Sequence, residues 1–228
     1  MATPTRKRSL SAYQQLVKEL YGPANERHYD VEGMLINVQR FSTRALKGIR
    51  KGEEEKIQLN LAITTSWFLS LLNQLGIDLE KAVWHRFPYE CSYCVSCPCI
   101  CKDKKINKRK RFKALHPRKP VTLEDLQKMF DQIYPMEKRT PEHAGIHLAE
   151  EVGEFAEAVF RFRGKHGKEE LRNIELEAAD VFSCVMGVCN SLEFNFSKEV
   201  FGMFARGCHV CHKKPCECSY TSVMGFKS

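Results

Sequence analysis

Long apolar runs are missing from this sequence. No run reaches the roughly 18 consecutive apolar residues that a membrane-spanning helix needs, and the longest candidate, residues 67–72, is far shorter. The first residues, MATPTRKRSL, are basic but lack the apolar stretch that follows such charges in a signal peptide. We therefore expect a cytoplasmic protein with no membrane partner.

Acidic residues are scarce in the first half of the chain. Residues 1–120 contain 23 Lys and Arg against 11 Asp and Glu, a net charge of +12, whereas residues 121–228 have a net charge of −4. The basic half predicts an anionic partner, either nucleotide phosphates or a nucleic-acid backbone. The basic residues are densest at 102–119, which we interpret as a solvated linker. The alternative is an arm that attracts phosphate, with Phe112 and His116 as stacking groups.

Cysteine is abundant, although nothing in the sequence indicates export. Eleven cysteines without an export signal favour metal binding over disulfides. Eight of them form two groups with the same spacing, C-x2-C-x4-C-x-C, which is typical of a closed structural zinc site. The predicted zinc ligands are Cys91, Cys94, Cys99 and Cys101 at the first site, and Cys208, Cys211, Cys216 and Cys218 at the second.

The repeated cysteine spacing reveals an internal duplication. An offset of 117 residues superimposes the two cysteine groups and also pairs Asn73 with Asn190, and an offset of 113 pairs Leu20 and Tyr21 with Ile133 and Tyr134. Apolar periodicity predicts three longer helices and one short helix before each cysteine group. We therefore predict an all-α protein with one repeat at 1–101, a basic linker at 102–119 and a second repeat at 120–228. In the first repeat, Gly22-Pro23 is expected to end the first helix at about residue 21.

Two pairs of acids stand on helices of the second repeat. Glu151 and Glu154 are three residues apart, as are Glu177 and Asp180, so each pair lies on one helix face. Both pairs border apolar positions, where an unpaired charge is costly. Four carboxylates meeting between two helices would repel one another without a cation, and Mg²⁺ or Mn²⁺ prefers oxygen ligands.

The pattern E-x-x-E, a short turn and E-x-x-D resembles the MazG-like family of all-α nucleoside triphosphate pyrophosphohydrolases. The runs HLAEEVGEFAEA and AADV in the second repeat, and NQLGIDLEKAV in the first, carry the same resemblance. It implies two tandem MazG-like helical bundles packed as a pseudo-dimer, each ending in a zinc knuckle. It also implies cleavage of a (deoxy)nucleoside triphosphate between its α and β phosphates with Mg²⁺ or Mn²⁺. A homodimer of the tandem chain is left open.

The resemblance assigns candidate roles to residues of the second repeat. The metal ligands would be Glu151, Glu154, Glu177 and Asp180, and Glu150 is a further candidate for the catalytic base. Cations near the turn between the two helices could hold the phosphates, and Asn190 could touch the nucleotide. The candidates for substrate binding are Lys165, Lys168, Arg172 and Asn190.

The first repeat departs from the family pattern. At the offset of 117, its counterparts of the four acids are Met34, Asn37, Asn60 and Ile63, so it retains no acid at these positions. We expect one active centre per chain, in the second repeat. A competing hypothesis is a nucleic-acid-binding or regulatory protein that uses its zinc knuckles, basic first half and linker.

Overall fold

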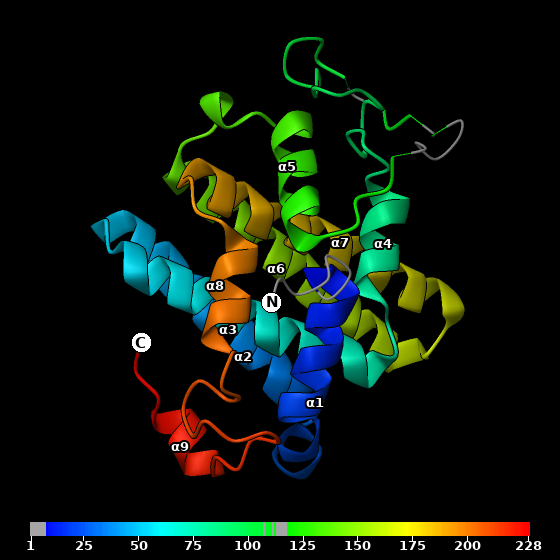
Figure 1. Cartoon of the computed structure of the whole chain (residues 1–228). Coiled ribbons are helices and arrows are strands. Elements are labelled where there is room, and N and C mark those ends of the chain that lie inside the picture. The colour runs from blue at the N-terminus through cyan, green and yellow to red at the C-terminus, as the bar shows by residue number, and fades with distance from the viewer. Residues whose placement is uncertain (1–7, 107, 111, 113–117) are drawn as a thin grey trace. The chain divides into compact units, whose positions relative to one another are not determined.

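The computed structural model describes residues 8–106, 108–110, 112 and 118–228, and its helices are drawn in Figure 1. These residues form nine α-helices and one short 3₁₀ helix, and no strand occurs among them, so the predicted all-α class is confirmed. None of the helices in the described ranges is long and apolar enough to cross a membrane. His116, a candidate stacking residue, lies outside the described residues.

The chain forms two compact units that cut across the two repeats. The first unit comprises Met1–Asp78 and Phe196–Ser228, and the second comprises Leu79–Asn195. Each unit thus combines the three longer helices of one repeat with the short helix and the cysteine group of the other. The predicted division describes the sequence repeats, at 1–101, 102–119 and 120–228, and it stays a prediction. The compact units of the structure have different boundaries.

The first unit is built on a bundle of helices from the first repeat. Ser9 caps its first helix, and the tyrosine ring of Tyr13 packs in the core against Phe196 and Phe204. The helices of this unit are α1 (Leu10–His28), α2 (Val31–Lys51), α3 (Glu54–Leu75), α8 (Phe196–Met203) and α9 (Tyr220–Gly225). The prediction that Gly22-Pro23 ends α1 is wrong, because the helix continues through Pro23 and buries Ala24 and Asn25 in its last turns.

The second unit holds the helices that carry the predicted acids. They are α4 (Leu79–Arg86), α5 (Leu123–Ile133), the 3₁₀ helix η2 (Met136–Lys138), α6 (Pro141–Lys165) and α7 (Lys168–Ser191). Thr122 and Asp125 form a capping box at the start of α5, and Thr140 caps α6. Phe130 packs between Phe87 and Phe182 in the core.

Equivalent contacts recur in the two units. The backbone N–H of Cys216 donates to the carbonyl of Leu20 over 2.7 Å, and that of Cys99 donates to the carbonyl of Ile133 over 2.8 Å. Leu20 and Ile133 are counterparts at the 113 offset, and the two cysteines are counterparts at 117. These contacts support the predicted duplication and show that each cysteine group joins the helices of the other repeat.

Cutting the chain in the linker tests this exchange of segments. We expect the two fragments to remain associated after cleavage at a protease site introduced at residues 108–110, because each compact unit contains segments from both sides of the cut. Size-exclusion chromatography of the cleaved protein should show one species under native conditions and two fragments in denaturant. Separation under native conditions would contradict the exchanged arrangement.

Candidate active site and cysteine clusters

Three of the four predicted acids meet between α6 and α7. One carboxylate oxygen from each of Glu151, Glu177 and Asp180 lies within 4.8 Å of the other two, and we call this group the acidic cluster. The turn at His166 and Gly167 reverses the chain, so that α7 runs back along α6. The three side chains are half-buried, because the neighbouring positions on both helices belong to the apolar core.

Burial and mutual repulsion perturb the acidic cluster. Burial, followed by the charges of Asp180, Glu154 and Glu177, raises the pKa of Glu151 to about 7. Burial and the charge of Asp180 also raise the pKa of Glu177. The Oε2 atom of Glu151 is buried without a hydrogen-bond partner. A buried acceptor without a donor is costly, and a divalent cation would relieve both this cost and the repulsion. The donor set therefore fits a cation that prefers oxygen.

An arginine that the sequence patterns did not single out completes the cluster. Arg86, the last residue of α4, donates from Nε to Oδ1 of Asp180 over 3.0 Å and from Nη2 to Oδ2. The side chain of Arg86 is 8% exposed and that of Asp180 is 14% exposed, so water screens this pair only weakly. Burial lowers the pKa of Arg86, but the hydrogen bond and charge of Asp180 outweigh it and raise the pKa overall.

Sequence signals for Arg86 exist, although they are weak. It follows closely after the apolar run Ala82, Val83 and Trp84 at the end of a short helix. The structure buries these residues, and burial is unusual for an arginine. Its counterpart at the 117 offset is Met203, just as the counterpart of Asp180 is Ile63. The charged pair of the second unit thus corresponds to two apolar residues in the first.

The fourth predicted ligand, Glu154, lies at the edge of the acidic cluster. Its side chain is exposed and is absent from the group of three oxygens that come within 4.8 Å. Its charge nevertheless contributes to the raised pKa of Glu151 and Glu177. Glu154 and Glu177 both line a hollow of about 360 Å³ between α6 and α7, which leads outward from the cluster toward Arg161.

The structure does not bring Glu150 into the acidic cluster. Its side chain is 60% exposed and lies 3.8 Å from Nδ1 of His147 on the same helix. Asn190 is also elsewhere, because its Nδ2 donates to the carbonyl of Gln127 over 3.2 Å. The counterpart Asn73 makes the same bond to the carbonyl of Gln14, which indicates a structural role for both asparagines.

The predicted phosphate-binding cations lie around the turn between α6 and α7. Lys165 is exposed and pairs with Glu170 over 3.1 Å. Lys168 and Arg172 are exposed in the first turns of α7. Arg161 pairs with Glu157 on α6 and reaches the same hollow as Glu154. Arg161 therefore lines the hollow, whereas the structure brings none of the predicted Lys165, Lys168 and Arg172 to the acidic cluster.

The first unit has no carboxylate at the corresponding positions. Met34 and Ile63 are buried in its core. Asn37 and Asn60 are also buried, and their Nδ2 atoms donate to carbonyl oxygens of their own helices, those of Gly33 and Lys56. The interface between α2 and α3 therefore lacks the acids that make the second unit a candidate cation site.

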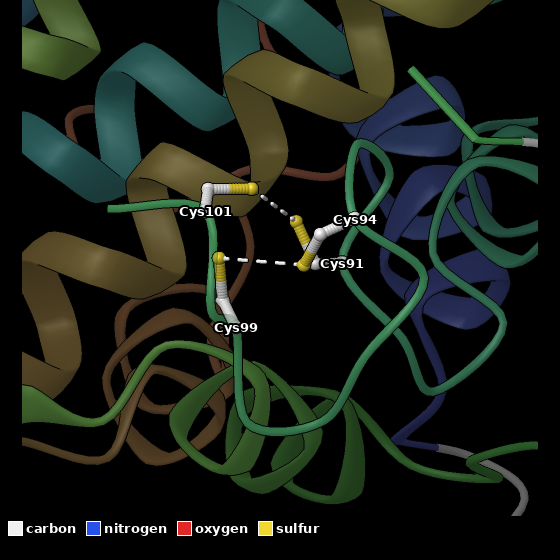
Figure 2. A group of neighbouring side chains, drawn as sticks. All are labelled: Cys91, Cys94, Cys99 and Cys101. Carbon is white, nitrogen blue, oxygen red and sulfur yellow. Dashed lines mark hydrogen bonds between the residues drawn. The ribbon is translucent and has the colours of Figure 1, made fainter. Parts of the chain in front are cut away.

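The first cysteine group has the geometry of a tetrahedral metal site. Figure 2 shows the four sulfur atoms turned toward one another. The Sγ atoms of Cys91 and Cys101 are 3.8 Å apart, and those of Cys94 and Cys99 are 3.9 Å apart. Four sulfurs bound about 2.3 Å from one tetrahedral ion would lie about 3.8 Å apart. The observed spacing therefore fits an ion such as zinc.

The second cysteine group repeats this arrangement in the first unit. Its Sγ atoms lie 3.9 Å apart in the pair Cys208–Cys218 and 3.9 Å apart in the pair Cys211–Cys216. A backbone N–H, from Val210, points at Sγ of Cys208 over 3.4 Å. The other cysteines, Cys97, Cys184 and Cys189, belong to neither group.

In the described residues these features define an all-α protein in which three carboxylates meet between two antiparallel helices. Residues 139–206 match the family model of the MazG nucleotide pyrophosphohydrolase domain, so this part of the chain is a MazG domain. The searches of curated proteins and of solved structures gave no match. The matched residues include the whole acidic cluster and stop short of the second cysteine group.

Replacing the buried pair by its counterparts from the first unit tests the electrostatics of the site. Arg86→Met or Asp180→Ile alone leaves one buried charge without a partner, so each should lower the free energy of unfolding by about 3–5 kcal/mol. The double variant should lie within about 1 kcal/mol of the parent protein, because both charges are gone. Urea unfolding without divalent cations, followed by Trp84 fluorescence in a Trp67→Phe background, measures this. Additive losses in the double variant would contradict the pairing.

Proposed function

We propose that the protein is a metal-dependent nucleotide pyrophosphohydrolase. It would cleave a (deoxy)nucleoside triphosphate between the α and β phosphates, giving the monophosphate and pyrophosphate. The observation that carries the proposal is the acidic cluster of Glu151, Glu177 and Asp180, which lies within the part of the chain that matches the MazG domain.

Each acid has a role that follows from its position. Glu151, Glu177 and Asp180 would hold Mg²⁺ or Mn²⁺, and Glu154, at the edge of the hollow, would complete the ligand set nearest the substrate. When bound, the metal would polarise the phosphate oxygens and lower the pKa of a bound water. The carboxylates would orient that water through their remaining lone pairs.

Cations of the chain have two separate tasks in this proposal. Arg86 neutralises Asp180 and fixes the direction of its carboxylate, so that the oxygens of Asp180 keep lone pairs aimed at the cluster. Lys165, Lys168 and Arg172 around the turn would attract the triphosphate and stabilise the charge on the leaving pyrophosphate.

We also infer that both cysteine groups hold structural zinc. All four sulfurs of each group are used, so no ligand position remains for chemistry. Each group joins segments that are far apart in the sequence, as the bonds from Cys99 and Cys216 show. The zinc sites would therefore stabilise the fold, whereas the acids would carry the reaction.

Removing single acids tests the enzymatic proposal. Asp180→Asn and Glu177→Gln should lower kcat for pyrophosphate release by at least about 100-fold, since losing a metal ligand removes several kcal/mol of transition-state stabilisation. A panel of canonical and damaged triphosphates with Mg²⁺, analysed by anion-exchange chromatography for monophosphate and pyrophosphate, gives the measurement. Glu175→Gln, on the same helix but outside the cluster, is the matched control and should retain activity.

The competing function is nucleic-acid binding by the linker and first cysteine group. Its support is the guanidinium of Arg109, which lies 5.7 Å from the ring centre of Tyr93 beside that group. A nucleic-acid binder would shift an oligonucleotide probe with a steep salt dependence and would be indifferent to Asp180→Asn. Such binding without pyrophosphate release from any triphosphate would overturn the enzymatic proposal.

The zinc assignment has its own test, with a control inside the same loop. Cys94→Ser should lower the zinc content from about two ions to about one per chain and destabilise the second unit, because three thiolates no longer close the site. Cys97→Ser removes an exposed cysteine that is not part of the group and should keep about two ions. Elemental analysis of the purified proteins decides between these outcomes, and equal zinc content in both variants would refute the assignment.

A further inference from the structure

The first unit carries two arginines beside the positions at which it lacks the acids of the second unit. At the 117 offset, Arg40 corresponds to Glu157, and Arg44 corresponds to Arg161. Both arginines lie on α2, on the same face as Asn37, which replaces the acid Glu154. The degenerate counterpart of the acidic cluster is therefore bordered by two guanidinium groups and contains no carboxylate.

The two guanidinium groups converge on one neutral oxygen. Arg40 donates from Nη2 to the carbonyl of Phe226 over 3.0 Å, and Arg44 donates from Nη1 to the same carbonyl over 3.2 Å. In the described part of the chain neither arginine has a carboxylate within ion-pair distance. Burial, and then the charge of Arg40, lowers the pKa of Arg44. A guanidinium binds an anionic oxygen more strongly than a carbonyl, and two of them favour a phosphate.

Three polar atoms without partners belong to Arg40 or to residues near it. The hydroxyl of Tyr29, Oδ1 of Asn37 and Nη1 of Arg40 are all buried and have no hydrogen-bond partner. The charge of Arg40 also acts on Tyr29, so the two groups are near each other. Asn37 itself is 3% exposed. Unpaired buried polar atoms are costly, and a cluster of them with donors at Tyr29 and Arg40 indicates a site for a ligand that accepts hydrogen bonds.

No residue of the segment that covers the arginines, residues 219–228, is fully buried. Its helix α9 has no buried residue. Its hydrogen bonds run from Arg40 to the carbonyls of Met224 and Phe226, from Arg44 to the carbonyl of Phe226 and Oγ of Ser228, and from Ser228 Oγ to Oδ1 of Asn60. The rings of Tyr220 and Phe226 add contacts with Tyr29, Phe41 and His209. A segment held by few buried contacts opens at low free-energy cost. It can therefore give way to a stronger acceptor.

We propose that Arg40 and Arg44 form a metal-independent binding site for a phosphate group, which residues 219–228 close. The phosphate displaces the carbonyl of Phe226 and takes up hydrogen bonds from Arg40 and Tyr29. Asn60 is the counterpart of Glu177, so the site stands where the first repeat has lost its acids. The first unit would thus sense an anion that its own repeat cannot hydrolyse.

An aromatic cavity beside this site offers a reporter. The cavity has a volume of about 70 Å³, and its walls include Tyr29, Phe41, Trp67 and Phe226. The ring of Tyr29 packs edge-on against Trp67 at 4.8 Å between centres. Movement of Tyr29 or Phe226 should therefore change the fluorescence of Trp67. In a Trp84→Phe background, Trp67 is the sole indole, because the sequence has two tryptophans.

The test is a titration without Mg²⁺ or Mn²⁺, with inorganic phosphate in one arm and a nucleoside monophosphate in the other. We expect a saturable change in Trp67 fluorescence. Arg40→Gln with Arg44→Gln should weaken binding at least roughly tenfold, because two charge-assisted bonds are lost. Lys47→Gln with Arg50→Gln removes two exposed charges from the same helix and should leave binding unchanged. Phe226→Ala should strengthen binding several-fold by loosening the covering segment.

The outcomes separate the ligands and the sites. Equal affinity in both arms assigns the site to the phosphate alone, and tighter binding of the monophosphate assigns it to a nucleotide. Asp180→Asn should bind phosphate normally, so the result is independent of the enzymatic proposal. The proposed site would be overturned if Trp67 fluorescence showed no saturable change. It would also be overturned if the variant with both Arg40→Gln and Arg44→Gln bound phosphate as well as the parent protein. If that variant does not fold, Arg44→Gln alone replaces it, with an expected loss of several-fold.

Discussion

Repulsion among half-buried carboxylates is the constraint on which the second unit depends. Glu151, Glu177 and Asp180 lie on helices whose neighbouring positions form the core, so they cannot be moved into water without dismantling that core. Arg86 neutralises one of the three charges by pairing with Asp180. Burial, and then the remaining charge, raises the pKa of Glu151 and Glu177, and a divalent cation at this place would offset both effects.

The two repeats form an internal comparison. The cysteine groups and their bonds to the helices recur in both units, whereas the acids and their arginine occur in one. Replacing a buried ion pair by apolar residues of similar volume is often neutral or stabilising, and Ile63 with Met203 is such a replacement. The two units thus share the cysteine groups but not the acids, which agrees with the structural role proposed for the cysteines and the chemical role proposed for the acids.

Patterns of nearby residues in the sequence predicted those features of the structure that depend on short spacings along the chain. The helices, the two cysteine groups and the meeting of three acids follow from spacing along the chain, because helical period and ligand spacing are local properties. The sequence could not predict the partner of Asp180, since Arg86 lies 94 residues away and only the packing of α4 on α7 unites them. It also misjudged Pro23, where burial of the next turn outweighed the lost hydrogen bond. Glu150 is exposed because of how α6 is rotated about its own axis, and the sequence did not predict this rotation.

The exchange of short helices makes the surroundings of the acidic cluster depend on both repeats. The second unit takes α4 from the first repeat, and with it Arg86, whereas the short helix of the second repeat carries Met203 at the same position and lies in the first unit. A second repeat alone would therefore contain the acids without the arginine that pairs with Asp180. The first repeat has no carboxylate at the corresponding positions, but the charge of Asp180 in the second unit still depends on its Arg86.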